Sequence, residues 1–182
     1  MTKKDKYADL FQKRAGIKLD VGCGDAKQKG FVGMDIRKRK GVDIVHDVQK
    51  FPWPIPSNSC HTILMSHLWE HIEPKNRMKL MEEVWRVMKP DGQFLLSAPY
   101  STSRGAFQDP THYTAPNEAT FTYFDPMNPG QLYNVYKPSP WRLVRNNYQM
   151  NGNVEVIMYP WKKKNGRAMS LKEIQKELDK NA

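Results

Sequence analysis

The sequence predicts an α/β fold in which a mostly parallel, doubly wound sheet ends in an antiparallel hairpin. Between residues 15 and 100, short apolar runs alternate with helical patterns, which is typical of a parallel sheet. Near the C-terminus, two β-prone runs flank Asn151-Gly152-Asn153, and Asn-Gly between such runs is a strong hairpin signal. The length of 182 residues suits one compact core.

The first elements are a helix and four strands. Residues 5–15 are expected to form a leading helix with Leu10 and Phe11 on its apolar side. Short apolar runs bounded by glycine, proline or polar residues then predict buried strands. These predicted strands cover residues 17–21, 31–36, 42–48 and 60–66.

The clearest helix is predicted over Pro74–Lys89, because proline is favoured at the first helical position. One helical stripe carries Met78, Met81, Val84, Trp85 and Met88, and we interpret it as the face that packs on the sheet. The turn-forming run Pro90-Asp91-Gly92 is expected to end this helix before a strand over residues 93–98.

The remainder predicts an insertion, a hairpin and a terminal helix. Residues 99–140 are rich in proline and aromatic residues without periodicity, so we expect a long irregular insertion that closes a binding pocket. The hairpin strands are expected at 141–150 and 154–161, and Ser170 with Glu173 forms a capping-box pattern that starts a helix. We therefore expect one domain over 1–161, with the insertion at about 99–140, followed by a basic linker and C-terminal helix over 162–182.

Composition excludes several classes of protein. The two cysteines, Cys23 and Cys60, are too few for a disulfide framework or a four-cysteine zinc site. No apolar run reaches the roughly 20 residues of a membrane span, and the N-terminus lacks an apolar signal segment, so a cytoplasmic protein is expected.

Lys and Arg number 29 against 19 Asp and Glu, a net charge of +10. These charges concentrate at 3–14, 37–40 and 162–167, either as solvated termini and loops or as a nucleic-acid-binding face.

A glycine-bounded turn follows the first predicted strand, in the run Asp20-Val21-Gly22-Cys23-Gly24. Glycines there let the backbone approach a ligand closely. A dinucleotide-binding turn would have a third glycine where this chain has Lys27, and an acidic residue roughly 20 positions further on. Asp35 follows Gly24 after only eleven residues, so a nicotinamide cofactor fits poorly.

Two carboxylates stand at the ends of consecutive predicted strands. Asp35 ends the second strand, where a carboxylate can accept hydrogen bonds from both hydroxyls of a ribose. Asp47 ends the third strand, where it can accept from an exocyclic amine such as that of adenine. Each aspartate could instead cap a turn, but ligands of open α/β sheets bind at this edge.

Together these residues resemble the cofactor signature of class I S-adenosylmethionine-dependent methyltransferases. The resemblance rests on LDVGCG (residues 19–24) with Gly33-Met34-Asp35, and on three further stretches in the same order. These stretches are His46-Asp47-Val48 followed by FPWPIPSNSCHTI, SHLWEHI over 66–72, and EVWRVMKPDGQFLLSAP over 83–99. Asp91, and Cys60-His61, depart from the family pattern. The resemblance implies a Rossmann-like, seven-stranded sheet and S-adenosylmethionine as cofactor.

Carried over position by position, the resemblance also implies a role for each site residue. The methionine portion of the cofactor would lie against Asp20, Gly22, Cys23 and Gly24. The ribose would meet Asp35, and the adenine would meet Asp47 and Val48. Ile36 would also belong to the cofactor-binding residues. Ser66 and His67 would border the methyl-donor site. No metal site is expected, because no His/Cys cluster has the spacing of zinc ligands.

Methyl transfer from a sulfonium needs alignment and exclusion of water more than a special nucleophile. If the acceptor carries a proton, a general base helps, and His112 in the run Asp109-Pro110-Thr111-His112 is our first candidate. His67 is the second candidate, whereas His71 is expected to satisfy local backbone groups. A structural histidine in a proline turn is the alternative for His112.

The function predicted from the sequence is methyl transfer from S-adenosylmethionine, with a small-molecule acceptor favoured. Two alternatives stay open: a methyltransferase-like protein that binds without catalysing, and an RNA- or DNA-directed methyltransferase that uses the basic residues. The sequence specifies neither the acceptor nor the oligomeric state.

Overall fold

The computed structural model describes residues 7–12 and 16–180. The predicted leading helix is present in its described part as α1 (Ala8–Gln12), and the rest of residues 5–15 lies partly outside the described residues. Within the part of the chain described, no helix is long and apolar enough to cross a membrane.

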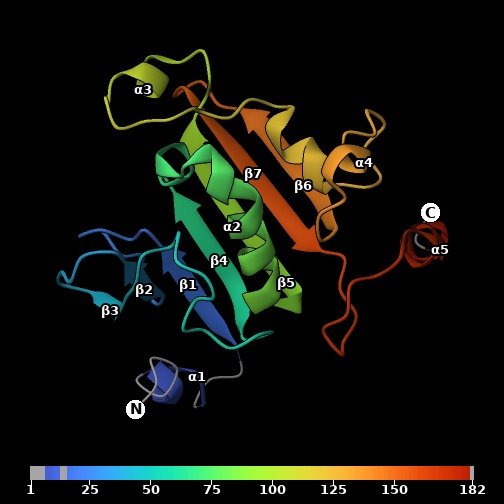
Figure 1. Ribbon diagram of the computed structural model, residues 1–182, viewed down its shortest axis with the longest axis horizontal. Helices are drawn as coiled ribbons and strands as arrows, with labels where there is room; N and C mark the ends of the chain where they lie inside the picture. The colour runs from blue at the N-terminus through green and yellow to red at the C-terminus, as the bar shows by residue number, and fades with distance from the viewer. Residues whose placement is uncertain (1–6, 13–15, 181–182) are drawn as a thin grey trace.

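A seven-stranded sheet forms the centre of the molecule, with strand order β3-β2-β1-β4-β5-β7-β6 (Figure 1). The first five strands are parallel, and β7 runs antiparallel to both β5 and β6. The strands are β1 (Ile17–Val21), β2 (Val32–Asp35), β3 (Val42–Val45), β4 (Cys60–Ser66), β5 (Met88–Pro99), β6 (Trp141–Tyr148) and β7 (Asn153–Pro160). This arrangement confirms the predicted Rossmann-like α/β fold with its C-terminal antiparallel hairpin.

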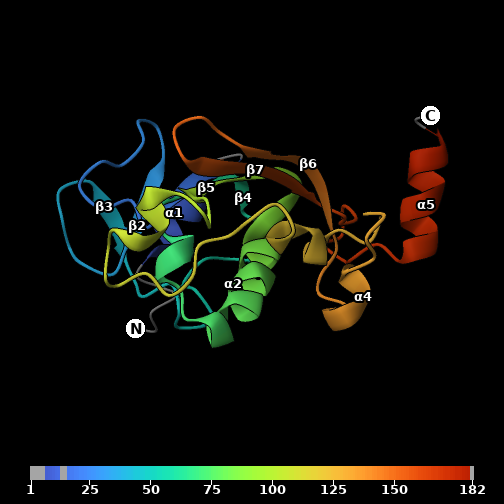
Figure 2. The ribbon, with the colours of Figure 1, turned by 90° about the horizontal axis from the view of Figure 1, so that it is seen from above.

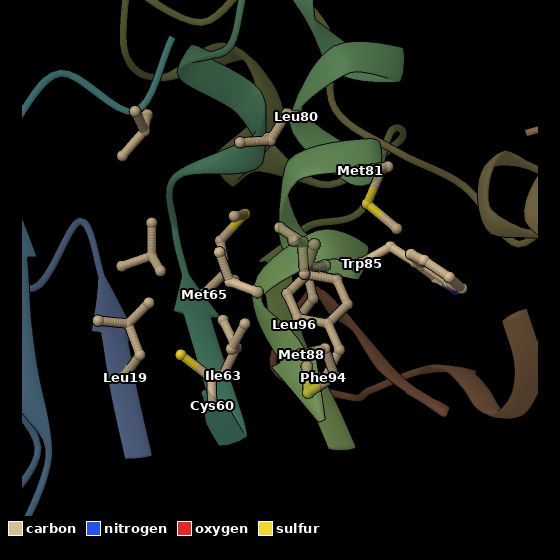
Figure 3. Packing of buried hydrophobic residues seen from close by; sticks show 14 of the residues in the cluster. Leu19, Cys60, Ile63, Met65, Leu80, Met81, Trp85, Met88, Phe94 and Leu96 are labelled. Atoms are coloured by element: carbon tan, nitrogen blue, oxygen red, sulfur yellow. The ribbon is translucent and has the colours of Figure 1, made fainter. Parts of the chain in front are cut away.

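Helix α2 (Pro74–Val87) connects β4 to β5 and covers one face of the sheet, on the same side as α4 (Tyr133–Tyr136) (Figure 2). Its predicted stripe belongs to the core: Met81, Val84 and Trp85 are buried in the same cluster as the strands, and Met78 is partly buried against it. Figure 3 shows Met81 and Trp85 near labelled core residues of the strands. The helix ends at Val87 rather than Lys89. Lys89 precedes Pro90, and a residue before proline is disfavoured in the α-helical region, so the chain turns extended and enters β5 directly.

The run Pro90-Asp91-Gly92 does not separate helix from strand as expected, because it lies inside β5 as a bulge. Cys60 pairs with Met88 and Thr62 pairs with Gln93. Between these two pairs the chain advances five residues along β5 but only two along β4. A Cβ built on Gly92 would lie 2.6 Å from Met88 Sδ and 2.9 Å from the His61 carbonyl oxygen. Glycine is therefore required where the bulge folds back on β4.

The insertion over 99–140 is mostly irregular, as predicted, and contains three short helices: α3 (Arg104–Phe107), η3 (Thr120–Phe124) and α4. Phe121 and Phe124 of η3 are buried in the same core cluster as the strands. The Phe121 ring lies 5.1 Å from that of Trp69, which follows β4. The insertion is thus anchored to the core at η3, whereas Phe107 of α3 is exposed.

The expected boundary at residue 162 falls on a residue that contacts the core. Lys162 is 6 % exposed, and its Nζ donates hydrogen bonds to the Trp85 and Met88 carbonyl oxygens at 2.6 and 2.8 Å. It therefore satisfies carbonyls at the C-terminus of α2, and burial lowers its pKa to about 8.

The capping box is present, since the Ser170 N–H donates to Glu173 at the start of α5 (Leu171–Lys180). The division into domains stays a prediction.

Replacing Lys162 by Met is expected to lower the free energy of unfolding by about 2–3 kcal/mol, because the buried carbonyls of Trp85 and Met88 lose their charged donor. Urea unfolding followed by circular dichroism measures this loss. The neighbouring Lys164→Met, at an exposed position, is the control and should leave the unfolding midpoint unchanged. Equal midpoints for the two variants would show that Lys162 contributes nothing there.

Candidate active site

The glycine turn after β1 is held by backbone contacts to β2. The N–H groups of Gly22 and Cys23 donate to the Met34 carbonyl oxygen at 2.8 and 3.3 Å. Gly22 and Gly24 have φ values of +72° and +51°, a region that favours glycine. A Cβ built on Gly22 would lie 2.9 Å from Leu68 Cδ2, whereas one built on Gly24 would meet no atom within 4 Å. The turn is therefore packed on its Gly22 side and open at Gly24.

Asp20 and Cys23 are both buried within this turn. Asp20 Oδ2 accepts a hydrogen bond from the Gln28 N–H at 2.8 Å, so the carboxylate fixes the path of the segment between β1 and β2. Burial raises the pKa of Asp20. Burial also raises the pKa of the Cys23 thiol to about 11, which keeps it neutral at pH 7 and unsuited to nucleophilic chemistry.

Asp35 lies at the carboxyl end of β2, directly beside the open part of the turn. Its Oδ2 accepts from the Gly24 N–H at 3.0 Å, and its Oδ1 accepts from the Arg37 N–H at 2.9 Å. An ionised carboxylate offers about four acceptor positions, so each oxygen keeps one for a ligand. Asp35 is thus oriented by the backbone and still able to bind a diol.

The neighbouring positions supply an apolar surface and a second carboxylate. Ile36 is 61 % exposed immediately after Asp35. The His46 N–H donates to the Asp35 carbonyl oxygen at 2.9 Å, which carries the chain to Asp47 and the buried Val48 next to β2. Asp47 Oδ1 accepts from the Gln49 N–H at 3.0 Å. The structure therefore brings together the residues that sequence reasoning assigned to adenosine.

A matched pair of glycines tests the open turn. Gly24→Ala and Gly30→Ala each place a Cβ at a positive φ with no atom within 4 Å, so each is expected to cost about 1–2 kcal/mol of stability. Only Gly24→Ala is expected to weaken binding of S-adenosylhomocysteine, by at least tenfold, because only Gly24 donates to the Asp35 carboxylate and borders the proposed site. Titration calorimetry on both variants measures this difference, and equal affinities would contradict it.

A second group of side chains gathers at the carboxyl ends of β4 and β5. Ser66, the last residue of β4, is exposed, and His67 follows with a φ of +51°. His67 Nδ1 lies 3.4 Å from Oε1 of Glu70, which is in the 3-10 helix η2 (Trp69–His71). The approach lacks hydrogen-bond geometry, but the carboxylate raises the pKa of His67.

His112 belongs to the same group. Its ring packs edge-on against that of His71, with centroids 4.6 Å apart, although 41 residues separate the two in sequence. His71 Nδ1 lies 3.1 Å from Thr111 Oγ1, so its described contact is with a side chain rather than the backbone. His112 and Phe107 also line a cavity of about 400 Å³ within the insertion, all of whose lining residues lie between 101 and 115. The two histidines predicted as catalytic thus both approach the side chains around Glu70.

A larger cavity, of about 940 Å³, lies elsewhere. It is lined by Pro90, Trp161 and Leu178, at the amino end of the parallel strands and against α5. Ligands of open α/β sheets bind at the carboxyl ends of the strands, so we place the active site at the glycine turn rather than in this cavity.

Comparison with known proteins agrees with the fold. The strand order, with an antiparallel pair of strands at its C-terminal edge, matches the Rossmann-like methyltransferase fold. Residues 19–96 match the family described as a methyltransferase domain. This match spans the part of the sheet from β1 to β5. No curated protein sequence matches it significantly.

Solved structures share the fold at low sequence identity. A SAM-dependent methyltransferase from Archaeoglobus fulgidus is 14 % identical with a TM-score of 0.60, covering 86 % of this chain and 92 % of that one. A SAM-dependent methyltransferase from Aquifex aeolicus is 18 % identical with a TM-score of 0.53, covering 85 % and 88 %. The W203A mutant of a 16S rRNA (adenine(1408)-N(1))-methyltransferase from Catenulisporales acidiphilia is 13 % identical with a TM-score of 0.57, covering 92 % and 93 %.

Glu70 is the residue that sequence reasoning missed. It is 1 % exposed, and a buried carboxylate is rare unless it is paired. Within SHLWEHI it looked like part of a family motif, and only its position between His67 and His71, after an apolar strand, could have singled it out.

Proposed function

We propose that this chain binds S-adenosylmethionine across the carboxyl ends of β1, β2 and β3 and transfers its methyl group to a small-molecule acceptor. The observation that carries the proposal is Asp35, whose carboxylate is fixed by the Gly24 and Arg37 N–H groups beside an open glycine turn. The residues around this turn fit the adenosyl group, because backbone can be approached closely at Gly24 and acceptor capacity remains on Asp35.

Each residue of the turn has a separate task in this proposal. Asp35 accepts hydrogen bonds from the two ribose hydroxyls, and Ile36 offers its exposed side chain to the adenine ring. Asp47 accepts from the exocyclic amine, while Val48 packs beneath it. Asp20 holds the turn through Gln28, which keeps Gly22 and Gly24 in place for the methionine portion.

Bound S-adenosylmethionine supplies an activated methyl group on a sulfonium. The chain then has to place the acceptor in line with that methyl group and exclude water, and such positioning can lower a barrier by up to roughly 7–11 kcal/mol. We assign the acceptor side to the ends of β4 and β5, where Ser66 and His67 border the turn. The insertion, anchored by Phe121, closes this side with His112.

A small-molecule acceptor is supported by the size of the cavity within the insertion and by the contacts that the basic residues make within the chain. The cavity of about 400 Å³ lies in the range of small-molecule sites. Much of the positive charge at 162–167 is engaged within the chain, since Lys163 and Arg167 pair with Glu173 and Lys162 is buried. Three of the four basic residues in this segment are therefore held by contacts within the chain.

The test has two stages. Thermal shift and calorimetry with S-adenosylmethionine, S-adenosylhomocysteine and NAD come first, and we expect stabilisation by the first two only. Product formation is then screened against metabolites and against RNA at low and high salt. Cofactor binding without turnover on any acceptor would favour the binding-protein alternative. Salt-sensitive methylation of RNA would contradict the small-molecule acceptor.

A further inference from the structure

We propose that Glu70, His71 and His112 form a binding site for a divalent transition-metal cation. Each residue offers one ligand atom, and the three atoms lie within 4.8 Å of one another. A tetrahedral ion with bonds of about 2.0–2.1 Å holds its ligand atoms about 3.4 Å apart. Side-chain rotations that move these atoms by about an ångström would therefore bring all three to bonding distance of one ion.

The carboxylate of Glu70 is the first reason to assign a cation here. Glu70 is 1 % exposed, and neither of its oxygens has a hydrogen-bond partner among the described residues. Arg77 is close enough to interact electrostatically, but its guanidinium donates to the Ile72 carbonyl oxygen and to Thr114 instead. The nearest titratable group is the half-exposed His67, whose Nδ1 lies 3.4 Å from Glu70 Oε1 without forming a hydrogen bond. A buried carboxylate that accepts no hydrogen bond is costly, and coordination of a metal lowers that cost.

The orientation of the two imidazoles is the second reason. Thr111 Oγ1 donates its only proton to Asp109 Oδ1 at 2.7 Å, so it accepts from the Nδ1–H of His71 at 3.1 Å. The His112 Nδ1–H donates to the Ala106 carbonyl oxygen at 3.2 Å. Both rings therefore carry the proton on Nδ1 and a lone pair on Nε2. Metal-binding histidines are held in this way by an acceptor on the nitrogen that does not bind the metal.

The donor set indicates the class of ion. Two imidazole nitrogens and one carboxylate oxygen suit Zn²⁺, Fe²⁺ or Co²⁺, whereas Mg²⁺ prefers an octahedral shell of oxygens. Three protein ligands leave at least one coordination position open. The inference that this open position faces the methyl acceptor rests on the proposed function. The inference that an ion binds here does not depend on it.

The experiment is calorimetric titration of metal-free protein with Zn²⁺, with Mg²⁺ in parallel. We expect one Zn²⁺ per chain and no heat with Mg²⁺. Glu70→Gln and His112→Ala should each weaken Zn²⁺ binding at least tenfold, while His61→Ala, which removes an exposed histidine outside the group, should leave it unchanged. Thr111→Val, at an exposed position, is the gentler variant, and loss of its contact to His71 should weaken binding about 10–100-fold.

Three outcomes overturn the proposal: no stoichiometric Zn²⁺ binding by the wild type, unchanged affinity in both Glu70→Gln and Thr111→Val, or equal loss in His61→Ala. Calorimetry with S-adenosylhomocysteine is run on the same metal-free samples. Cofactor binding without Zn²⁺ binding refutes the metal site alone. Zn²⁺ binding without cofactor binding refutes the proposed function and leaves the metal site standing.

Discussion

Replacing Asp35 by Ala is expected to weaken binding of S-adenosylhomocysteine at least a hundredfold, or about 2.8 kcal/mol. Each hydrogen bond to a charged group contributes roughly 1.5–3 kcal/mol, and the proposed site gives Asp35 both ribose hydroxyls. The substitution also removes the acceptor of the Gly24 N–H, which loosens the turn beside the ligand. Titration calorimetry on the variant and the wild type measures the change.

The control for this prediction is Asp91→Ala, which removes an exposed carboxylate from the bulge at the amino end of the sheet. It should bind as the wild type does. Thermal melting of both variants separates loss of the ligand contact from loss of folding. Wild-type affinity in a well-folded Asp35→Ala protein would refute the role of this residue.

Replacing Phe121 by Ala is expected to lower the free energy of unfolding by about 3–5 kcal/mol, the range for a fully buried phenylalanine. The ring is 0 % exposed and packs on Trp69, so its loss leaves a cavity between the insertion and the segment that follows β4. Urea unfolding measures the change.

Phe107→Ala is the matched control within the same insertion. Phe107 is 79 % exposed, so its removal should change the free energy of unfolding by no more than about 0.5 kcal/mol. If the Phe121 and Phe107 variants unfold at the same urea concentration, η3 does not anchor the insertion.

The features predicted correctly from the sequence are those set by neighbouring residues. The strand at Ile17–Val21, the stripe of α2 and the hairpin around Gly152 follow from local apolar patterns and turn residues, and the structure confirms them. The end of α2 was predicted two residues late, because the restriction that Pro90 places on Lys89 outweighs the continuing helical pattern.

What the sequence did not reveal depends on contacts between distant segments. The burial of Lys162 depends on carbonyls some 75 residues earlier, at Trp85 and Met88. The grouping of Glu70 and His71 with His112 depends on the path of the insertion, which has no periodicity from which to predict it. The positions at Asp35 and Asp47 were predictable because consecutive parallel strands must end at one edge of the sheet.

The most direct test of the central claim is a crystal structure with S-adenosylhomocysteine bound. We expect electron density for the ligand across the ends of β1, β2 and β3, with both ribose hydroxyls within hydrogen-bonding distance of the Asp35 carboxylate. Density for the ligand in the larger cavity beside α5, with Asp35 free of it, would contradict this account.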